Sequence, residues 1–367
     1  MYIFAARTGI RSTVLLLALS VGLTVGGSAT AAAQPAPAAD VAAETGALSA
    51  TVRDAATGQP ASTCVQLVPV ERDRYTQVYL DEWQLGRRSS CSDEHGQILA
   101  EGVEPGRYQL FAWESLSGER QYGRQWVGLR GGTGQRHLAA VIRVRAGAVA
   151  TAPQIRLDPP GAITGTVTNA ATGQPVANAY VWWVPMVPHP KYTPDVAITD
   201  ANGRYRIDGF GPYRWPLQFS GVAFATQWSG GTGNALLART VQVRSGQTAT
   251  LDQALRASTT VRGAILIDEV PSYAPIIAFN AVTGDVVGVD YIGETYQIAV
   301  LPGQVIKLRC DCSRFSQWHP TGQAFSDAAV VPVGRTPVTI DFDFTATSSS
   351  AADPADHPAA GPPEPAS

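Results

Sequence analysis

An internal repeat constrains this chain of 367 residues more than any other feature of its sequence. The segment Gly46–Pro60 aligns with Gly161–Pro175, and ten of the fifteen aligned positions are identical. Further blocks follow in the same order: an Asp-x-x-Gly turn, a Gln-Trp pair that occurs three times, and a Val-Arg-x-Gly turn. Shared order marks duplicated domains rather than chance matches, so the sequence predicts three modules, at residues 46–158, 159–256 and 257–345.

The repeated blocks have the patterns of β-structure. Thr166, Val167 and Thr168 alternate as a strand does, and Asp200–Gly203 has turn chemistry in which the glycine supplies a positive φ. Turn signals recur about every 8–12 residues, and no apolar stripe of helical period follows the first 33 residues. The predicted fold class is therefore all-β, as three tandem antiparallel Ig-like or prealbumin-like β-sandwiches.

The two ends of the chain differ in composition from these modules. Residues 1–33 combine Arg7 and Arg11 with the apolar stretch Val14–Val25 and the small residues Ala31–Ala33, which predicts a cleaved signal peptide. Residues 34–45 form a linker, and residues 346–367, rich in Pro and Ala, are predicted to be a disordered tail. No later stretch is long and apolar enough for a membrane span, so we expect a secreted, extracellular protein without a stable membrane anchor.

Charge and motifs limit the function classes. The formal net charge is −3, and removal of the signal peptide makes it more negative, which disfavours nucleic acid as a partner. No nucleophile elbow, phosphate loop or metal-binding histidine spacing occurs in the sequence. Carboxylates such as Asp195, Asp200 and Asp208 are interpreted as turn or solvent-exposed groups. The sequence thus predicts no enzyme activity, no metal site and no cofactor.

At Gly161–Pro212 the residues resemble a known family. They follow the pattern G-x-[IV]-x-G-x-V, T-G-x-P-V, D-x-x-G-x-Y-x-[IL], which is typical of the carboxypeptidase regulatory-like domain. That resemblance implies a transthyretin-like β-sandwich, related to collagen-adhesin B-type repeats and to the carbohydrate-binding-like fold, in proteins secreted by Gram-positive bacteria. It covers the first two modules well and the third through fewer positions. For function it implies folding support, spacers and recognition surfaces.

The four cysteines all follow the signal peptide, and an even number in an exported chain predicts disulfides. Cys64 and Cys91 are expected to lie at facing positions on two neighbouring strands, so we predict that they pair. Cys310 and Cys312 would then form the second bridge, which needs a bend in the strand. A Cys-Asp-Cys metal site is the alternative for that second pair.

Aromatic residues are the remaining candidates for binding. Trp126, Trp228 and Trp318 recur at one position of all three modules, which favours core packing. Tyr180 and Trp182 share the strand face opposite Val181, and they are the candidate ligand-binding residues. Their rings would either bury against a neighbouring module or form a surface for a glycan or a protein.

Two function classes therefore stay open. The first is a secreted, non-catalytic structural or interaction protein whose stacked modules form a semi-rigid rod. The alternative is a carbohydrate-binding array of the starch or α-glucan type, or an accessory to polysaccharide degradation. The expected partner is an extracellular glycan or protein, and the sequence leaves the oligomeric state undetermined.

Overall fold

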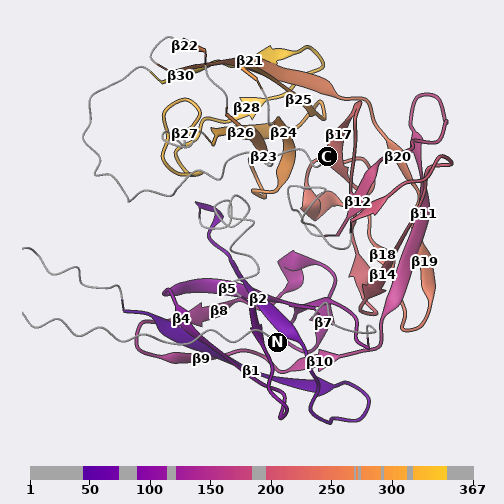
Figure 1. The fold of residues 1–367 in the computed structure, drawn as a ribbon, viewed down its shortest axis with the longest axis vertical. Coiled ribbons are helices and arrows are strands. Elements are labelled where there is room, and N and C mark those ends of the chain that lie inside the picture. The colour runs from indigo at the N-terminus through magenta and orange to yellow at the C-terminus, as the bar shows by residue number, and fades with distance from the viewer. Residues whose placement is uncertain are drawn as a thin grey trace, which may run out of the picture. The chain divides into compact units, whose positions relative to one another are not determined.

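The computed structural model describes residues 44–73, 89–113, 121–183, 196–267, 270–271, 274–290, 293–311 and 317–344. In these ranges the regular structure is β-strand, apart from two short 3-10 helices, η1 (Arg136–Leu138) and η2 (Ala235–Leu237), and the helical residues Arg72 and Asp73 (Figure 1). The predicted all-β class is confirmed. The predicted signal peptide and C-terminal tail, and most of the predicted linker, lie outside the described residues.

Module 1 consists of two sheets. In the first, β1 (Gly46–Asp54) pairs antiparallel with β4 (Gln97–Val103), and parallel with β9 (Val149–Thr151) and β10 (Ile155–Leu157). The second has the order β3-β2-β5-β6-β7, with β8 also paired to β5. Its strands are β2 (Cys64–Pro69), β3 (Ser89–Cys91), β5 (Gly106–Trp113), β6 (Gln125–Val127), β7 (Gly132–Thr133) and β8 (Ile142–Val144).

Module 2 repeats this arrangement. Its first sheet places β11 (Gly161–Asn169) between β14 (Arg204–Phe210) and the parallel strands β19 (Thr248–Thr250) and β20 (Gln253–Leu255). The second has the order β13-β12-β16-β17, and β15 pairs with β18. Its strands are β12 (Tyr180–Trp182), β13 (Ala197–Ile198), β15 (Arg214–Trp215), β16 (Gln218–Gly221), β17 (Phe224–Trp228) and β18 (Val241–Gln242).

Module 3 follows the same plan. β21 (Thr259–Ile267) pairs antiparallel with β25 (Thr295–Val300) and β22 (Val270–Pro271), and parallel with β29 (Val338–Thr339) and β30 (Phe342–Phe344). The second sheet has the order β24-β23-β26-β27, with β28 also paired to β26. Its strands are β23 (Ile276–Asn280), β24 (Val286–Asp290), β26 (Val305–Cys310), β27 (Gln317–Trp318) and β28 (Val331–Pro332).

Alternation along the first strand of each module builds its core. In β1, Leu48, Ala50 and Val52 are buried and the residues between them are partly exposed. A strand places successive side chains on opposite faces, so one face of β1 packs on the second sheet. Every strand ladder described joins strands of one predicted module, although the module boundaries themselves stay a prediction.

The direction of pairing differs from the purely antiparallel sheets expected. The first strand of each module has an antiparallel neighbour on one side and parallel neighbours on the other. In each module the chain forms the second sheet before its last strands return to the first sheet. A connection of that length permits parallel pairing. Repeated motifs locate strands but do not reveal this direction. No helix in the described ranges is long and apolar enough to cross a membrane.

Candidate functional site at the module joints

The repeated tryptophans are core residues, as predicted. Trp126, Trp228 and Trp318 are each almost fully buried. The Trp126 ring lies 5.0 Å from that of Phe111, centroid to centroid, and the Trp318 ring lies 5.0 Å from that of Phe279. These rings therefore fix the sheets internally and are not a surface for a ligand.

The glutamines before Trp126 and Trp228 have a role that the sequence did not reveal. Gln125 Nε2 donates to the carbonyl of Arg156 at 3.0 Å, and Gln227 Nε2 donates to the carbonyl of Arg256 at 3.4 Å. Arg156 lies in β10 and Arg256 follows β20, so both amides hold the chain where it leaves a module. The recurrence of the Gln-Trp pair was the available signal.

Arg124 connects modules 1 and 2. Its side chain is 4% exposed, and Nε and Nη2 donate to the carbonyls of Gly209 and Asp208 at 3.0 and 2.8 Å. The guanidinium carbon also lies 4.4 Å from the ring centroid of Trp183, within the range of a cation–π contact. In turn, Trp183 stacks on Phe111 of module 1 with centroids 5.0 Å apart.

Tyr213 adds a polar contact to the same joint. Its hydroxyl donates to Gln125 Oε1 and lies 2.9 Å from Asp158 Oδ2. Burial, and secondarily the negative charge of Asp158, raise the pKa of Tyr213 well above its ordinary value. The phenol thus stays neutral and acts as a donor at the point where the chain passes from module 1 to module 2.

Trp182 lies where modules 2 and 3 meet. Its side chain is 4% exposed, and its indole N–H donates to Gln218 Oε1. Gln218 Nε2 then donates to the carbonyl of Val286 in module 3 at 3.0 Å, and Asn280 Nδ2 donates to the carbonyl of Gly233 at 2.9 Å. Tyr180 is partly exposed, with its ring centroid 6.4 Å from that of Trp182. These contacts favour inter-module packing for Trp182, while a ligand role for the pair stays a prediction.

The two joints use corresponding parts of successive modules. A Cβ added to Gly134 of module 1 would lie 2.5 Å from the carbonyl of Arg214, and one added to Gly233 of module 2 would collide with Gln304. Gly134 and Gly233 both follow the threonine of a repeated Thr-Gly turn, and Arg214 begins β15 while Gln304 directly precedes β26. A side chain at Gly134 would collide with the main chain of module 2, whereas at Gly233 the flexible Gln304 side chain would have to move.

Modules 1 and 3 also contact each other. The backbone N–H of Ser326 donates to Asp73 Oδ1 at 2.8 Å. Modules in an extended rod would touch only their sequence neighbours, so this contact does not fit the semi-rigid rod of the first function class. Lys307 lies close by, where its ammonium group is 4.4 Å from the ring centroid of Phe325. Burial lowers the pKa of Lys307, with Asp73 opposing the shift.

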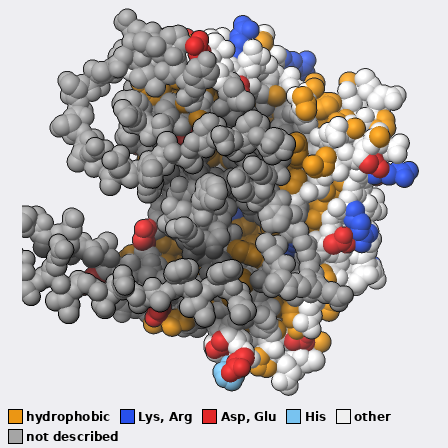
Figure 2. All heavy atoms as spheres, in the orientation of Figure 1, with side chains coloured by type: hydrophobic (Ala, Val, Ile, Leu, Met, Phe, Trp, Pro, Cys, Tyr) orange, Lys and Arg blue, Asp and Glu red, His pale blue; other side chains and the backbone are white. Residues whose placement is uncertain are grey.

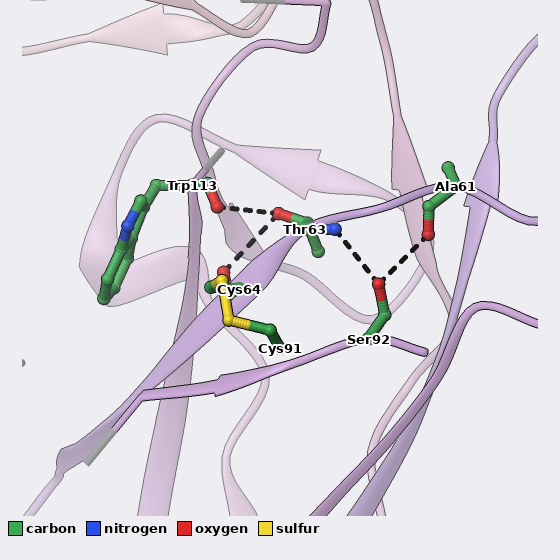
Figure 3. The surroundings of a disulfide bond; sticks show 6 residues. All are labelled: Ala61, Thr63, Cys64, Cys91, Ser92 and Trp113. Atoms are coloured by element: carbon green, nitrogen blue, oxygen red, sulfur yellow. Dashed lines mark hydrogen bonds between the residues drawn. A yellow bond between two sulfur atoms is a disulfide. The ribbon is translucent and has the colours of Figure 1, made fainter. Parts of the chain in front are cut away.

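The disulfide predicted in module 1 is present. Cys64 and Cys91 face each other in the β2–β3 ladder and are bonded (Figure 3). Thr63, which directly precedes β2, donates from its hydroxyl to the carbonyl of Trp113 at 2.9 Å, and from its backbone N–H to Ser92 Oγ at 3.1 Å. Cys310 is also in a disulfide. Its predicted partner Cys312 lies outside the described residues, so that pairing stays a prediction.

Of the carboxylates interpreted as turn or solvent-exposed groups, Asp200 occupies a turn and Asp208 lies on the surface of β14. Asp200 Oδ1 accepts from the backbone N–H groups of Asn202 and Arg204 at 2.9 and 2.8 Å. Asp208 pairs with Arg206 on the surface at 2.7 Å, while Asp195 lies outside the described residues. Charged side chains are scattered singly over the described part of the face in Figure 2 and form no large area of one sign.

Comparison with known proteins supports the resemblance inferred from the motifs. Residues 162–256, which lie within the predicted second module, match the model of the carboxypeptidase regulatory-like domain. A comparison with curated proteins gave no match.

Similar solved structures share only low identity with this chain. The TIE protein of Bacillus anthracis is 10% identical with a TM-score of 0.22; the match covers 82% of this chain, which spans half the length of that protein. The minor pilin GBS52 of Streptococcus agalactiae is 13% identical with a TM-score of 0.24, over 58% of this chain and 96% of the pilin. A candidate carbohydrate-binding protein of Bacteroides uniformis is 10% identical with a TM-score of 0.19, over 48% and 97%.

Proposed function

We propose that this protein is an exported, non-catalytic structural or interaction protein, in which three docked β-sandwich modules act as one body outside the cell. The observation that carries the proposal is the construction of the joints. Arg124 and Gln218 are buried side chains whose hydrogen bonds reach the main chain of the next module. Such bonds are lost when modules separate, and a buried group without its partner is costly.

A body whose modules are held in fixed positions suits a structural role. Loosely linked modules join through exposed linkers and small polar contacts. Here the chain is held at the first crossing by Gln125 and Tyr213, and just before the second crossing by Gln227. Export is supported by the residue pattern at positions 1–33 and by the Cys64–Cys91 disulfide, which persists in oxidising compartments.

The carbohydrate-binding alternative rests on Tyr180 and Trp182. Burial of Trp182 leaves Tyr180 as the more accessible ring of the pair, so stacking on a sugar would need the joint to open. A glycan array and a polysaccharide pull-down with the mature chain separate the two functions. We expect no retention on any glycan; retention that is lost in Tyr180→Ala, with folding intact, would establish the alternative. Turnover of a polysaccharide by the purified chain would contradict both.

A further inference from the structure

The β6–β7 hairpin of module 1 is longer than its counterparts in the other modules. The tryptophan of the Gln-Trp pair and the following repeated threonine are seven residues apart in module 1, four in module 2 and three in module 3. The extra residues form a tight turn closed by a bond of 2.7 Å from Gly128 N–H to the Gly131 carbonyl, with Gly131 at φ 145°. At its tip the Leu129 side chain is 79% exposed.

Two further aliphatic side chains are exposed beside this turn. Leu138 is 55% and Val141 is 52% exposed. The backbone N–H of Ala140 donates to the carbonyl of Val127 at 2.8 Å, which places the Leu138–Val141 segment against the hairpin. Solvent exposure of large aliphatic groups gathered in one area is the usual mark of an interaction surface.

A polar network holds this segment in place. Arg136 of η1 donates from Nε to Gln109 Oε1 at 3.1 Å and from Nη2 to the carbonyl of Pro69 at 2.9 Å. Gln109 returns a bond of 2.9 Å from Nε2 to the carbonyl of Arg136. Because η1 is tied to β5 and β2 in this way, Leu138 is kept pointing outward.

The same stretch of sequence is rich in arginine. Between Glu119 and Asp158 the sequence has seven arginines and no carboxylate. Arg143 and Arg145 share the exposed side of β8 with Val141, since Ile142 and Val144 are buried. Among the described residues, Arg130, Arg143 and Arg145 pair with no carboxylate. The nearby Glu71 is already paired with Arg107, which faces Arg143 in the β5–β8 ladder.

We propose that this surface, the module 1 rim (Leu129, Arg130, Leu138, Val141, Arg143 and Arg145), docks reversibly onto an anionic lipid surface. Exposed aliphatic groups that enter the interface, flanked by arginines that attract acidic headgroups, are the chemistry of peripheral membrane binding. A soluble polyanion would be recognised by the arginines alone and would leave Leu129 without a role. Three aliphatic side chains are far fewer than a spanning segment needs, so the contact is peripheral. The inference is independent of the structural role proposed above.

The test is flotation of the full mature chain with vesicles of phosphatidylcholine, alone or mixed with phosphatidylglycerol. We expect binding to the mixed vesicles only, weakened by salt because the arginine contribution is screened. Arg130→Ser with Arg143→Ser should lower the partition coefficient about fivefold per arginine. Leu129→Ser with Leu138→Ser should lower it about tenfold or more.

Leu237→Ser is the matched control. Leu237 is the counterpart of Leu138 in module 2, it is 72% exposed, and its replacement should leave vesicle binding unchanged. All these side chains are on the surface, and circular dichroism verifies that each variant is folded. Equal binding to neutral vesicles, or no binding at all, would overturn the proposal. Loss in the arginine variant with none in the leucine variant would also overturn it, because the surface would then recognise charge alone.

Discussion

Replacement of Arg124 is the sharpest test of the joint between modules 1 and 2. Arg124→Ala removes two side-chain hydrogen bonds to the carbonyls of Asp208 and Gly209, and the cation–π contact with Trp183. Bonds to a charged group contribute roughly 1.5 kcal/mol each and the cation–π contact about 1 kcal/mol. The variant also no longer bears the cost of burying the guanidinium charge, which offsets part of this sum. We expect a loss of about 2–4 kcal/mol in the free energy of unfolding, from these principles.

Urea unfolding followed by tryptophan fluorescence measures the loss. Arg124→Met is the matched control, because methionine keeps much of the aliphatic stem, so the difference between the two variants isolates the guanidinium. We also expect the single wild-type transition to separate into two in Arg124→Ala, as module 1 becomes uncoupled. A change below about 0.5 kcal/mol, the size usual for neutral surface substitutions, would refute the assigned contacts.

Three further predictions concern the disulfide of module 1, Trp182 and His319. Cys64→Ser with Cys91→Ser should lower the stability of module 1 by about 3–4 kcal/mol in urea unfolding, because the bridged residues are 27 apart in sequence; an unchanged midpoint would argue against a structural bridge. Trp182→Phe removes the donor to Gln218 and should cost about 1–2 kcal/mol in the same assay, with no effect on glycan retention; a variant as stable as wild type would contradict the joint role. Burial lowers the pKa of His319 below 6.5, so the unfolded state binds its proton first as the pH falls. The stability of module 3 should therefore be full above about pH 6.5 and decline below it, and His319→Gln should abolish that dependence; the same slope in both proteins would show that another group titrates.

The repeats made much of the fold predictable. Gly46–Pro60 and Gly161–Pro175 share turn residues and the alternating pattern of a strand. Both features depend on local backbone conformation, so the sequence alone predicts them. The facing positions of Cys64 and Cys91 followed from the alignment of the modules. The parallel pairing of the last strands did not, because it depends on how the chain crosses between sheets.

The joints were largely hidden from the sequence. Arg124 is one of many arginines, and nothing local distinguishes a buried one whose partners are carbonyls in another module. Trp182 was identified as unusual from its strand face, but whether such a ring is covered depends on the neighbouring module. The recurrence of glutamine before each core tryptophan was a usable signal, since a buried position of a sandwich rarely needs an amide.

The central claim, that the modules are docked into one body, is tested most directly by small-angle X-ray scattering from the mature chain. The described residues 44–344 belong to a single compact unit, which predicts a bell-shaped normalised Kratky plot and a radius of gyration near that of one globular body, about 19 Å for some 300 residues. A plot that rises to a plateau, with a much larger radius, would mean that the three sandwiches move independently, and it would contradict the account.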